Sequence, residues 1–415
     1  MKSSLRIIVT GLIGQHHTLG GVAWDYLQYV MGLRELGHDV WYFEDSGEWP
    51  YNLDGGPGGN DWVAYDCSRI VDYLRHIFSF AQLPDHWAYR FPIRSEWHGI
   101  PDSKRKEVMK TADLLINVSG TLENPSHYSD IDKRVYIDSD PVFTQIKLKS
   151  RQEDFCQRVH SHTTHFSFGE KLPGYLQTDG IHWHPTRSPI VLPCWREQRA
   201  NGKRYTTVMN WTSYPPLSFE GRRYSQKDTE FARFLDLPRM SNGLPFEVAI
   251  NKLVHGNWQT NIRDQVPGDT FASPVELLEH FGWNVVDAQA ECGNLFDYRN
   301  YIETSRAEWS VAKGGYAGVG PGWFSCRSAC YLAAGKPVIV QDTGFDGIIP
   351  TGTGVFSFNT IPEVVDALEK LESNYGVASI AAREIADEYF GATNVLSRLI
   401  DTTYAGGSLA VLSKR

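Results

Sequence analysis

One pattern at the start of the chain restricts its fold class more than any other. A continuously apolar, β-rich run at 6–10 is followed by a glycine-bearing loop, as expected for a strand covered on both faces. Apolar residues then recur at helical spacing over 22–36, and Gly37 follows as a helix stop. A second apolar run at 40–43 completes a βαβ unit, whose crossover brings both strands into one parallel sheet.

The same alternation continues through the rest of the chain. In the first half we expect further strands at 114–118, 135–137 and 165–168 and a helix at 62–80. In the second half we expect strands at 206–210, 246–250, 283–286, 309–311 and 337–340, with helices at 273–281, 297–304, 327–334, 362–373 and 378–389. A polar, turn-rich segment at 193–204 separates the halves as a linker. The pattern predicts an α/β protein with two doubly wound, Rossmann-like domains that face each other across a cleft.

Composition and charge exclude several other classes. Of the 415 residues, 21% are charged and 41% hydrophobic, which is ordinary globular composition rather than that of a disordered chain. The net charge of −9 gives no overall basic footprint for nucleic acid or an anionic membrane. No apolar run reaches the roughly 18 residues of a membrane-spanning helix. The six cysteines include no CxxC pair, which favours a reduced, cytoplasmic protein over a disulfide framework or a zinc site.

The loop at 11–21 lies between a predicted strand and a predicted helix. Backbone amides and the helix dipole favour an anion at such a place, and glycine lets a ligand approach the backbone. The loop is not GxGxxG, so the dinucleotide fingerprint of a nicotinamide-dependent oxidoreductase is missing. Contact with a substrate and a plain tight turn both remain open interpretations.

A second glycine-rich loop, at 313–328, carries the stronger signal. Five glycines precede a predicted helix that begins near Arg327 and Ser328. Amide donors, a guanidinium and a hydroxyl are what a diphosphate needs, and no GxxxxGK[ST] is present to indicate a Walker A site. We expect Lys313, Gly314, Arg327 and Ser328 to bind phosphate; the alternative is a flexible loop with a solvated arginine.

Two shorter segments follow other strands of the second half. Arg223 and Lys227 come after the strand at 206–210 and either pair with phosphate oxygens or belong to a solvated turn. Asp342 and Thr343 come after the strand at 337–340, where they can read hydroxyl groups of a donor sugar. Ligands collect at this edge of a doubly wound sheet.

Three segments together resemble the GT-B glycosyltransferases. Gly20-Gly21 begins the first helix, and the turn Gly-His-Asp-Val at 37–40 enters the second strand, as in the opening of that fold. Gly-Trp-Phe at 322–324 with Ala-Ala-Gly-Lys-Pro-Val at 333–338 is similar to its nucleotide-sugar loop and helix. The basic stretch at 221–227 is similar to its pyrophosphate segment. The three matches occur in the right order and span the whole chain.

The resemblance implies a division of labour between the halves. Residues 1–195, completed by a C-terminal helix at about 385–415, would bind the acceptor, and residues 204–384 would bind a nucleotide-diphosphate sugar. Gly20 and Gly21 would lie near the transferring sugar or its phosphate. Cys330 stands where such enzymes commonly carry a glutamate that contacts the donor ribose, and the acidic residue that usually opens the Gly-Phe-Gly loop is missing.

Acid–base candidates lie in the first half. His16 and His17 occupy the loop where inverting members of the fold place a catalytic histidine, and a general base there would deprotonate the acceptor hydroxyl. Asp138 and Asp140 end a strand, a position typical of structural caps as well as of catalysts. Asp25, in the first helix, either orients a histidine or faces solvent. No cluster has metal-ligand spacing, which agrees with the resemblance, because these enzymes generally need no bound metal.

The sequence therefore predicts a metal-independent glycosyltransferase without a cofactor. Its donor would be a nucleotide-diphosphate sugar, and its acceptor, a small molecule, a glycan or a nucleobase, stays open, as does the oligomeric state. Two alternatives remain: a sugar-nucleotide epimerase of the same fold, and a binding protein without catalytic activity.

Overall fold

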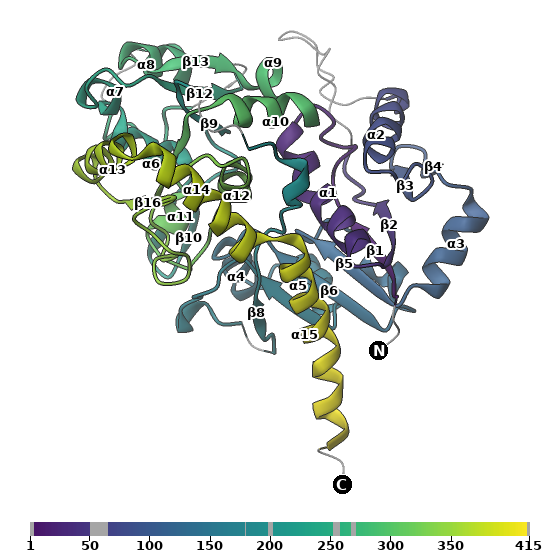
Figure 1. Cartoon of the computed structure of the whole chain (residues 1–415). Helices are drawn as coiled ribbons and strands as arrows, with labels where there is room; N and C mark the ends of the chain where they lie inside the picture. Colours follow the sequence, from purple (N-terminus) through teal and green to yellow (C-terminus); the bar gives the residue numbers. More distant parts are fainter. Residues whose placement is uncertain are drawn as a thin grey trace.

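Two α/β units form the body of the computed structural model, which describes residues 4–49, 65–178, 180–197, 202–251, 258–266 and 271–412, with side chains up to residue 405. Each unit is a mainly parallel sheet with helices packed against it (Figure 1). The predicted 62–80 helix and 193–204 linker fall partly outside the described residues.

The first unit holds an eight-stranded sheet ordered β4-β3-β2-β1-β5-β6-β7-β8. Its pairs are parallel except for the antiparallel β3–β4 pair. The strands are β1 (Arg6–Thr10), β2 (Asp39–Glu44), β3 (Trp87–Phe91), β4 (Glu96–Gly99), β5 (Leu114–Val118), β6 (Lys133–Asp138), β7 (Thr164–Ser167) and β8 (Trp183–Pro185). The helices are α1 (Gly20–Glu35), α2 (Ser68–Phe80), α3 (Asp102–Thr111), α4 (Phe143–Lys149) and α5 (Glu153–His160).

The second unit holds a six-stranded sheet ordered β13-β12-β9-β14-β15-β16 and a hairpin, β10–β11. The strands are β9 (Tyr205–Met209), β10 (Leu217–Phe219), β11 (Arg222–Tyr224), β12 (Phe246–Ile250), β13 (Asn284–Asp287), β14 (Ala307–Ser310), β15 (Val338–Gln341) and β16 (Val355–Phe358). The helices are α6 (Lys227–Phe231), α7 (Leu237–Met240), α8 (Pro274–His280), α9 (Ala288–Cys292), α10 (Leu295–Thr304), α11 (Gly314–Ala317), α12 (Cys326–Ala333), α13 (Ile361–Ser373), α14 (Tyr375–Ile385) and α15 (Ala392–Leu412).

The strand orders place a topological switch point in each sheet. In the first sheet the chain order reverses between β1 and β5, and in the second between β9 and β14. Ligands of doubly wound sheets bind outside the carboxyl ends of the strands at such points. The predicted α/β class with two Rossmann-like units is confirmed, and the order of the strands indicates where a ligand site is expected.

Two of the elements that the sequence pattern did not predict have weak burial signals. Strand β4 is largely exposed, and helix α3 buries only Val108 along its length. By contrast, β1 and β5 are almost wholly buried and begin and end where the apolar runs predict. The helix expected at 378–389 is α14, which begins at Tyr375 and passes into a π-helical turn, Ala386–Phe390.

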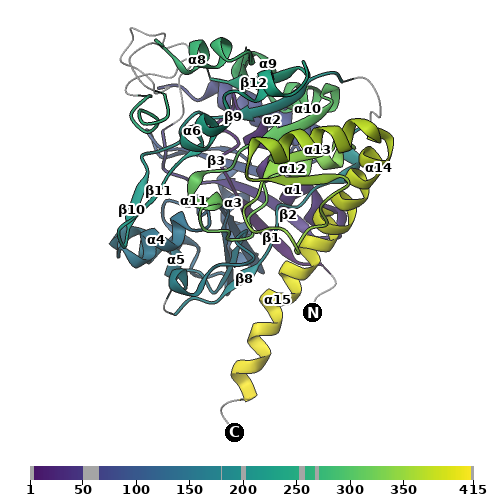
Figure 2. The ribbon, with the colours of Figure 1, turned by 90° about the vertical axis from the view of Figure 1, so that its left-hand side faces the viewer.

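The end of the chain returns to the first unit. The backbone of Ile190 pairs with that of residues 390–392 through hydrogen bonds of 2.7 and 2.8 Å. Helix α15 then packs along α1 and extends beyond the body (Figure 2). At the crossing, a Cβ on Gly32 would lie 2.6 Å from the Cβ of Ala392 and 2.7 Å from Leu396. Glycine is needed there because the two helices approach too closely for any side chain.

We therefore expect Gly32→Ala to destabilise the protein by about 1–3 kcal/mol, because overpacking a helix contact forces the backbones apart. Gly376→Ala is the matched control: it lies in α14, where a Cβ meets nothing within 4 Å, and should stabilise by about 0.5–1 kcal/mol. Denaturant unfolding measures both. A Gly32→Ala variant as stable as the wild type would contradict the close crossing.

Candidate functional site

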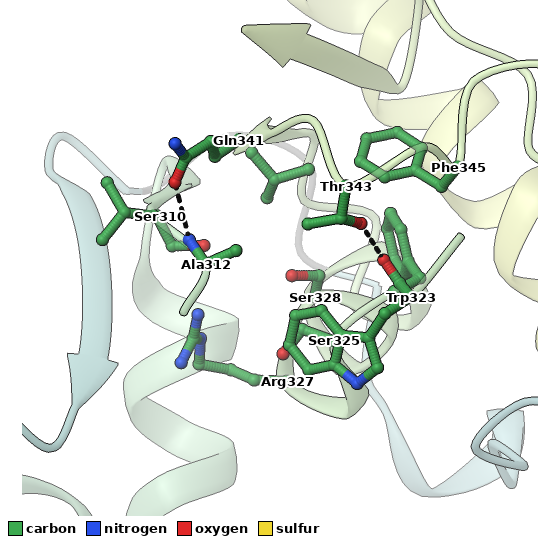
Figure 3. A pocket seen from close by; sticks show the side chains of 12 residues that line it. Ser310, Ala312, Trp323, Ser325, Arg327, Ser328, Gln341, Thr343 and Phe345 are labelled. Carbon is green, nitrogen blue, oxygen red and sulfur yellow. Dashed lines mark hydrogen bonds between the residues drawn. The ribbon is translucent and has the colours of Figure 1, made fainter. Parts of the chain in front are cut away.

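A small cavity lies at the carboxyl ends of β14 and β15, beside the first turn of α12. Its free space is about 10 Å³, roughly that of one water molecule. Figure 3 shows Arg327 and Ser328 lining it, with the amide of Ala312 bonded to Gln341 at 3.0 Å on the opposite side. The cavity therefore sits beside the switch point of the second sheet, with the glycine-rich loop as one of its walls.

The glycine-rich loop is fastened to the segment that follows β15. Gly320 and Gly322 have φ angles of 68° and 77°, the left-handed region that favours glycine. The Gly322 amide donates to the carbonyl of Thr343 at 2.7 Å, and the Thr343 hydroxyl donates to the carbonyl of Trp323. Asp342 accepts the Gly344 amide at 2.8 Å. Of the two residues predicted to read a donor sugar, Thr343 holds the two loops together and Asp342 bonds within its own segment; their contact with a sugar stays a prediction.

Arg327, in the first turn of α12, is engaged by the protein itself. Its Nε donates to the buried carboxylate of Glu308 at 2.6 Å, and one Nη donates to the carbonyl of Val208 at 2.6 Å. Ser328 next to it is buried. The amides of a helix's first turn have no acceptor within the helix and favour an anion. In α12 those amides belong to residues beside the cavity.

Lys227, unlike Arg327 and Lys313, has no carboxylate paired with it among the described residues. It begins α6, is half-buried, and has no hydrogen-bond or ion-pair partner within the described part of the chain. Burial, and then the positive charges of Arg327 and Lys313, lower its pKa well below the usual lysine value, against the attraction of the Glu308 carboxylate. The predicted residues Lys227, Lys313 and Arg327 thus form one electropositive cluster. Arg223 is separate, because its exposed guanidinium bonds Asn261 at 2.6 Å.

Lys313 reaches across the boundary between the units. Its ammonium lies 2.8 Å from Oδ1 of Asp140, which follows β6 in the first unit. Asp140 also accepts hydroxyl hydrogen bonds from Tyr214, at 2.5 Å, and from Tyr316. The neighbouring Gly314 has no room for a side chain, since a Cβ would lie 1.9 Å from Oγ of Ser225. The two tyrosines were not predicted as site residues. Their positions just after β9 and β14, at the carboxyl ends of these strands, could have indicated them.

Asp138, predicted as catalytic, is buried beneath this junction. It accepts hydrogen bonds from Thr144, Gln145 and Ser167 at 2.7–2.8 Å and from the amide of Asp140 at 3.0 Å. Burial raises its pKa to about 6. The geometry is that of an anchor that fixes the loop carrying Asp140; a catalytic role for Asp138 stays a prediction.

The loop with His16 and His17 is shaped by a glutamate that follows the second strand's apolar run. Glu44 accepts the amides of Gly14 and Gln15 at 2.8 and 2.6 Å and the hydroxyl of Tyr42 at 2.7 Å. Burial raises the pKa of Glu44 to about 7. Burial and the adjacent His17 lower the pKa of His16 to about 4, so its imidazole is neutral at neutral pH. Catalysis by either histidine stays a prediction.

Gly20 and Gly21, predicted to lie near the donor, pack against the second unit. A Cβ on Gly20 would lie 2.1 Å from the carbonyl of Asn294, and one on Gly21 would lie 2.9 Å from the ring of Tyr298. One turn further along α1, Asp25 meets the thiol of Cys326 and the charge of Arg327. The start of α1 thus forms part of the domain interface beside α12.

The described ranges offer neither a metal cluster nor a membrane-crossing helix. Within them, no group of three His, Cys, Asp or Glu side chains could hold a metal ion. None of their helices combines the length and apolar character that crossing a membrane requires.

No family model and no curated protein sequence matches this chain, but solved structures do. An α-glucosyltransferase in complex with UDP is similar with a TM-score of 0.58 and 10% identity, over 97% of this chain and 100% of that chain. The Anabaena protein HepE in complex with UDP gives 0.53 and 9%, and sucrose-phosphate synthase from Thermosynechococcus elongatus gives 0.53 and 10%, each over 96% of this chain and 99% of that chain. The fold is GT-B. The resemblance seen in the sequence is confirmed at the level of the fold.

The GT-B chain should depend on the Arg327–Glu308 pair for stability. Arg327→Met leaves a carboxylate that is 0% exposed without its guanidinium, and such losses cost about 3–5 kcal/mol. The double variant Arg327→Met/Glu308→Gln should recover most of this, because both charges are gone. Denaturant unfolding of the two variants tests the pair, and equal losses in both would argue against it.

A second expectation concerns Asp25, whose pKa burial raises to about 7. The folded state then holds a proton that the unfolded state releases near pH 4, so this group makes wild-type stability fall as pH rises from about 4 to about 7. Asp25→Asn lacks this effect and should gain stability relative to the wild type between about pH 5 and about pH 8. Unfolding at both pH values tests this, and a pH-independent difference would refute it.

Proposed function

We propose that the protein is a glycosyltransferase that moves a sugar from a nucleotide-diphosphate sugar to an acceptor hydroxyl or a similar nucleophile. The observation that carries the proposal is the Lys227 ammonium, which has no partner among the described residues and lies in the field of two further cations. A desolvated cation is costly unless an anion joins it. A diphosphate is an anion of suitable size and charge.

The surroundings of Lys227 fit that ligand. The first-turn amides of α12 and the backbone of the glycine-rich loop lie at the same cavity as Arg327 and Ser328. Charge builds up on the leaving nucleoside diphosphate during transfer, and preorganised cations and helix amides stabilise it. We propose that these groups do so without a metal ion, and that Lys313, Gly314 and Ser328 share in donor binding.

The acceptor would bind to the first domain. Its β1–α1 loop, held by Glu44, presents His16 and His17, and we propose that one of them receives the acceptor proton. The GT-B likeness supports transfer as the reaction class, because the similar structures include two named as a glucosyltransferase and a synthase. All six cysteines are free, which supports placing the reaction in the reducing cytoplasm.

Lys227→Met tests the donor site. Nucleoside diphosphates and their sugars should raise the melting temperature of the wild type. At a hundredfold excess of ligand over Kd, the free energy of unfolding should increase by about 2.7 kcal/mol. The variant should bind none of them yet be at least as stable without ligand, because it no longer buries a charge. Lys370→Met, which removes an exposed lysine paired with Asp366, is the control.

Donor hydrolysis and transfer to an acceptor panel complete the test. Conversion of the donor to an epimeric nucleotide sugar without an acceptor would favour the epimerase instead. Binding without any turnover would favour a binding protein. No binding of any nucleotide to the wild type would overturn the proposal.

A further inference from the structure

The carboxylate of Asp140 is held by three donors that all belong to the other domain. Lys313 donates at 2.8 Å, Tyr214 at 2.5 Å, and the hydroxyl of Tyr316 also donates to it. Tyr214 follows β9, and the other two follow β14. These are the two strands that flank the switch point of the second sheet. We call Lys313, Tyr214 and Tyr316 the anion cradle.

The cradle is built from packed rings. Phe143 of the first domain lies edge-on to the rings of Tyr214 and Tyr316, at centroid distances of 5.4 and 5.7 Å. The ring of Trp323, in the glycine-rich loop, lies 4.5 Å from that of Tyr316. The Lys313 ammonium stands 4.5 Å from the centroid of Tyr214 and 3.0 Å from its hydroxyl. Rings held in this way keep both hydroxyls and the ammonium aimed at one point.

The cradle borders the proposed diphosphate site. Lys313 is close enough to Lys227 for the two positive charges to interact. Trp323 lines the cavity beside α12 as well as contacting Tyr316. That cavity has about 10 Å³ of free space, far too little for a nucleotide sugar, whose pockets measure about 300–1,000 Å³. The cavity as it stands therefore cannot hold the donor by itself.

We propose that the anion cradle binds a phosphate group of the donor diphosphate, and that Asp140 occupies the cradle as an internal anion which the donor displaces. The inference rests on the proposed function and extends it. A carboxylate and a phosphate present the same acceptor oxygens to an ammonium and to hydroxyls. Displacement breaks the polar tie between Asp140 and the second domain.

Two roles of Asp140 give opposite results in binding experiments. If it competes with the donor, Asp140→Asn removes the competing charge and binding of inorganic pyrophosphate and of nucleoside diphosphates should tighten about tenfold. If it is only a structural tie that preorganises Lys313, the same variant should bind them equally or more weakly. Asp140→Ser is a second variant, in case the amide distorts the junction.

The tyrosines are then tested in the Asp140→Asn background. Tyr214→Phe and Tyr316→Phe should each weaken pyrophosphate binding about tenfold, because each loses a hydrogen bond to a charged ligand. Hydroxyls that serve only Asp140 would have no effect once its charge is gone. Tyr128→Phe is the matched control, since that buried hydroxyl also donates to an aspartate, Asp45, at 3.0 Å, within the first domain.

Isothermal titration of folded variants, checked by circular dichroism, separates the outcomes. Tighter binding in Asp140→Asn together with weaker binding in the tyrosine variants supports the proposal. Failure of either part overturns it, and the proposed function stands as long as Lys227→Met still abolishes binding. If neither the wild type nor Asp140→Asn binds pyrophosphate or any nucleoside diphosphate, the proposed function and the inference both fall.

Discussion

Three positively charged side chains lie at the edge of the second sheet, and the need to neutralise their charges organises the site. Arg327 is neutralised by Glu308 from its own domain, and Lys313 by Asp140 from the other. Lys227 has no such partner among the described residues. The three cations therefore have different surroundings: Arg327 is paired within its own domain, Lys313 is paired across the two domains, and we propose that Lys227 meets the ligand. Because buried charges are costly when unpaired, this distribution is the reason why we propose an anion site at Lys227.

Close backbone contact brings the two domains together around that charge. Gly20 and Gly21 let the start of α1 lie directly against α10, and Gly32 does the same for α15. The apolar core of the first domain continues through α1 into the helices of the second. The glycine pair that the resemblance places near the donor therefore has a packing role at the interface. Both a packing role and substrate contact would require a backbone without a side chain.

Much of the fold could be predicted because its strands are buried on both faces. Continuous apolar runs such as 6–10 and 114–118 became β1 and β5 without adjustment. The edge strand β4 was not predicted, because a half-exposed segment mixes apolar and polar side chains and gives no continuous apolar run. Strand ends also show how far the predicted site residues lie together: Arg327 and Ser328 line one cavity, and the charge of Lys227 interacts with those of Lys313 and Arg327. Their binding of a donor stays a prediction.

The sequence by itself determined the α/β class, the two-part division and the glycine-rich loop, since each depends on residues that are neighbours along the chain. The tertiary structure alone decided which charges meet. Asp140 and Lys313 are 173 positions apart, and patterns of neighbouring residues cannot predict such a contact. The same holds for Arg223, which fits the basic motif yet lies beside Asn261 instead. Spacing along the chain fixes which face of an element a side chain occupies, whereas packing between domains fixes what that face meets.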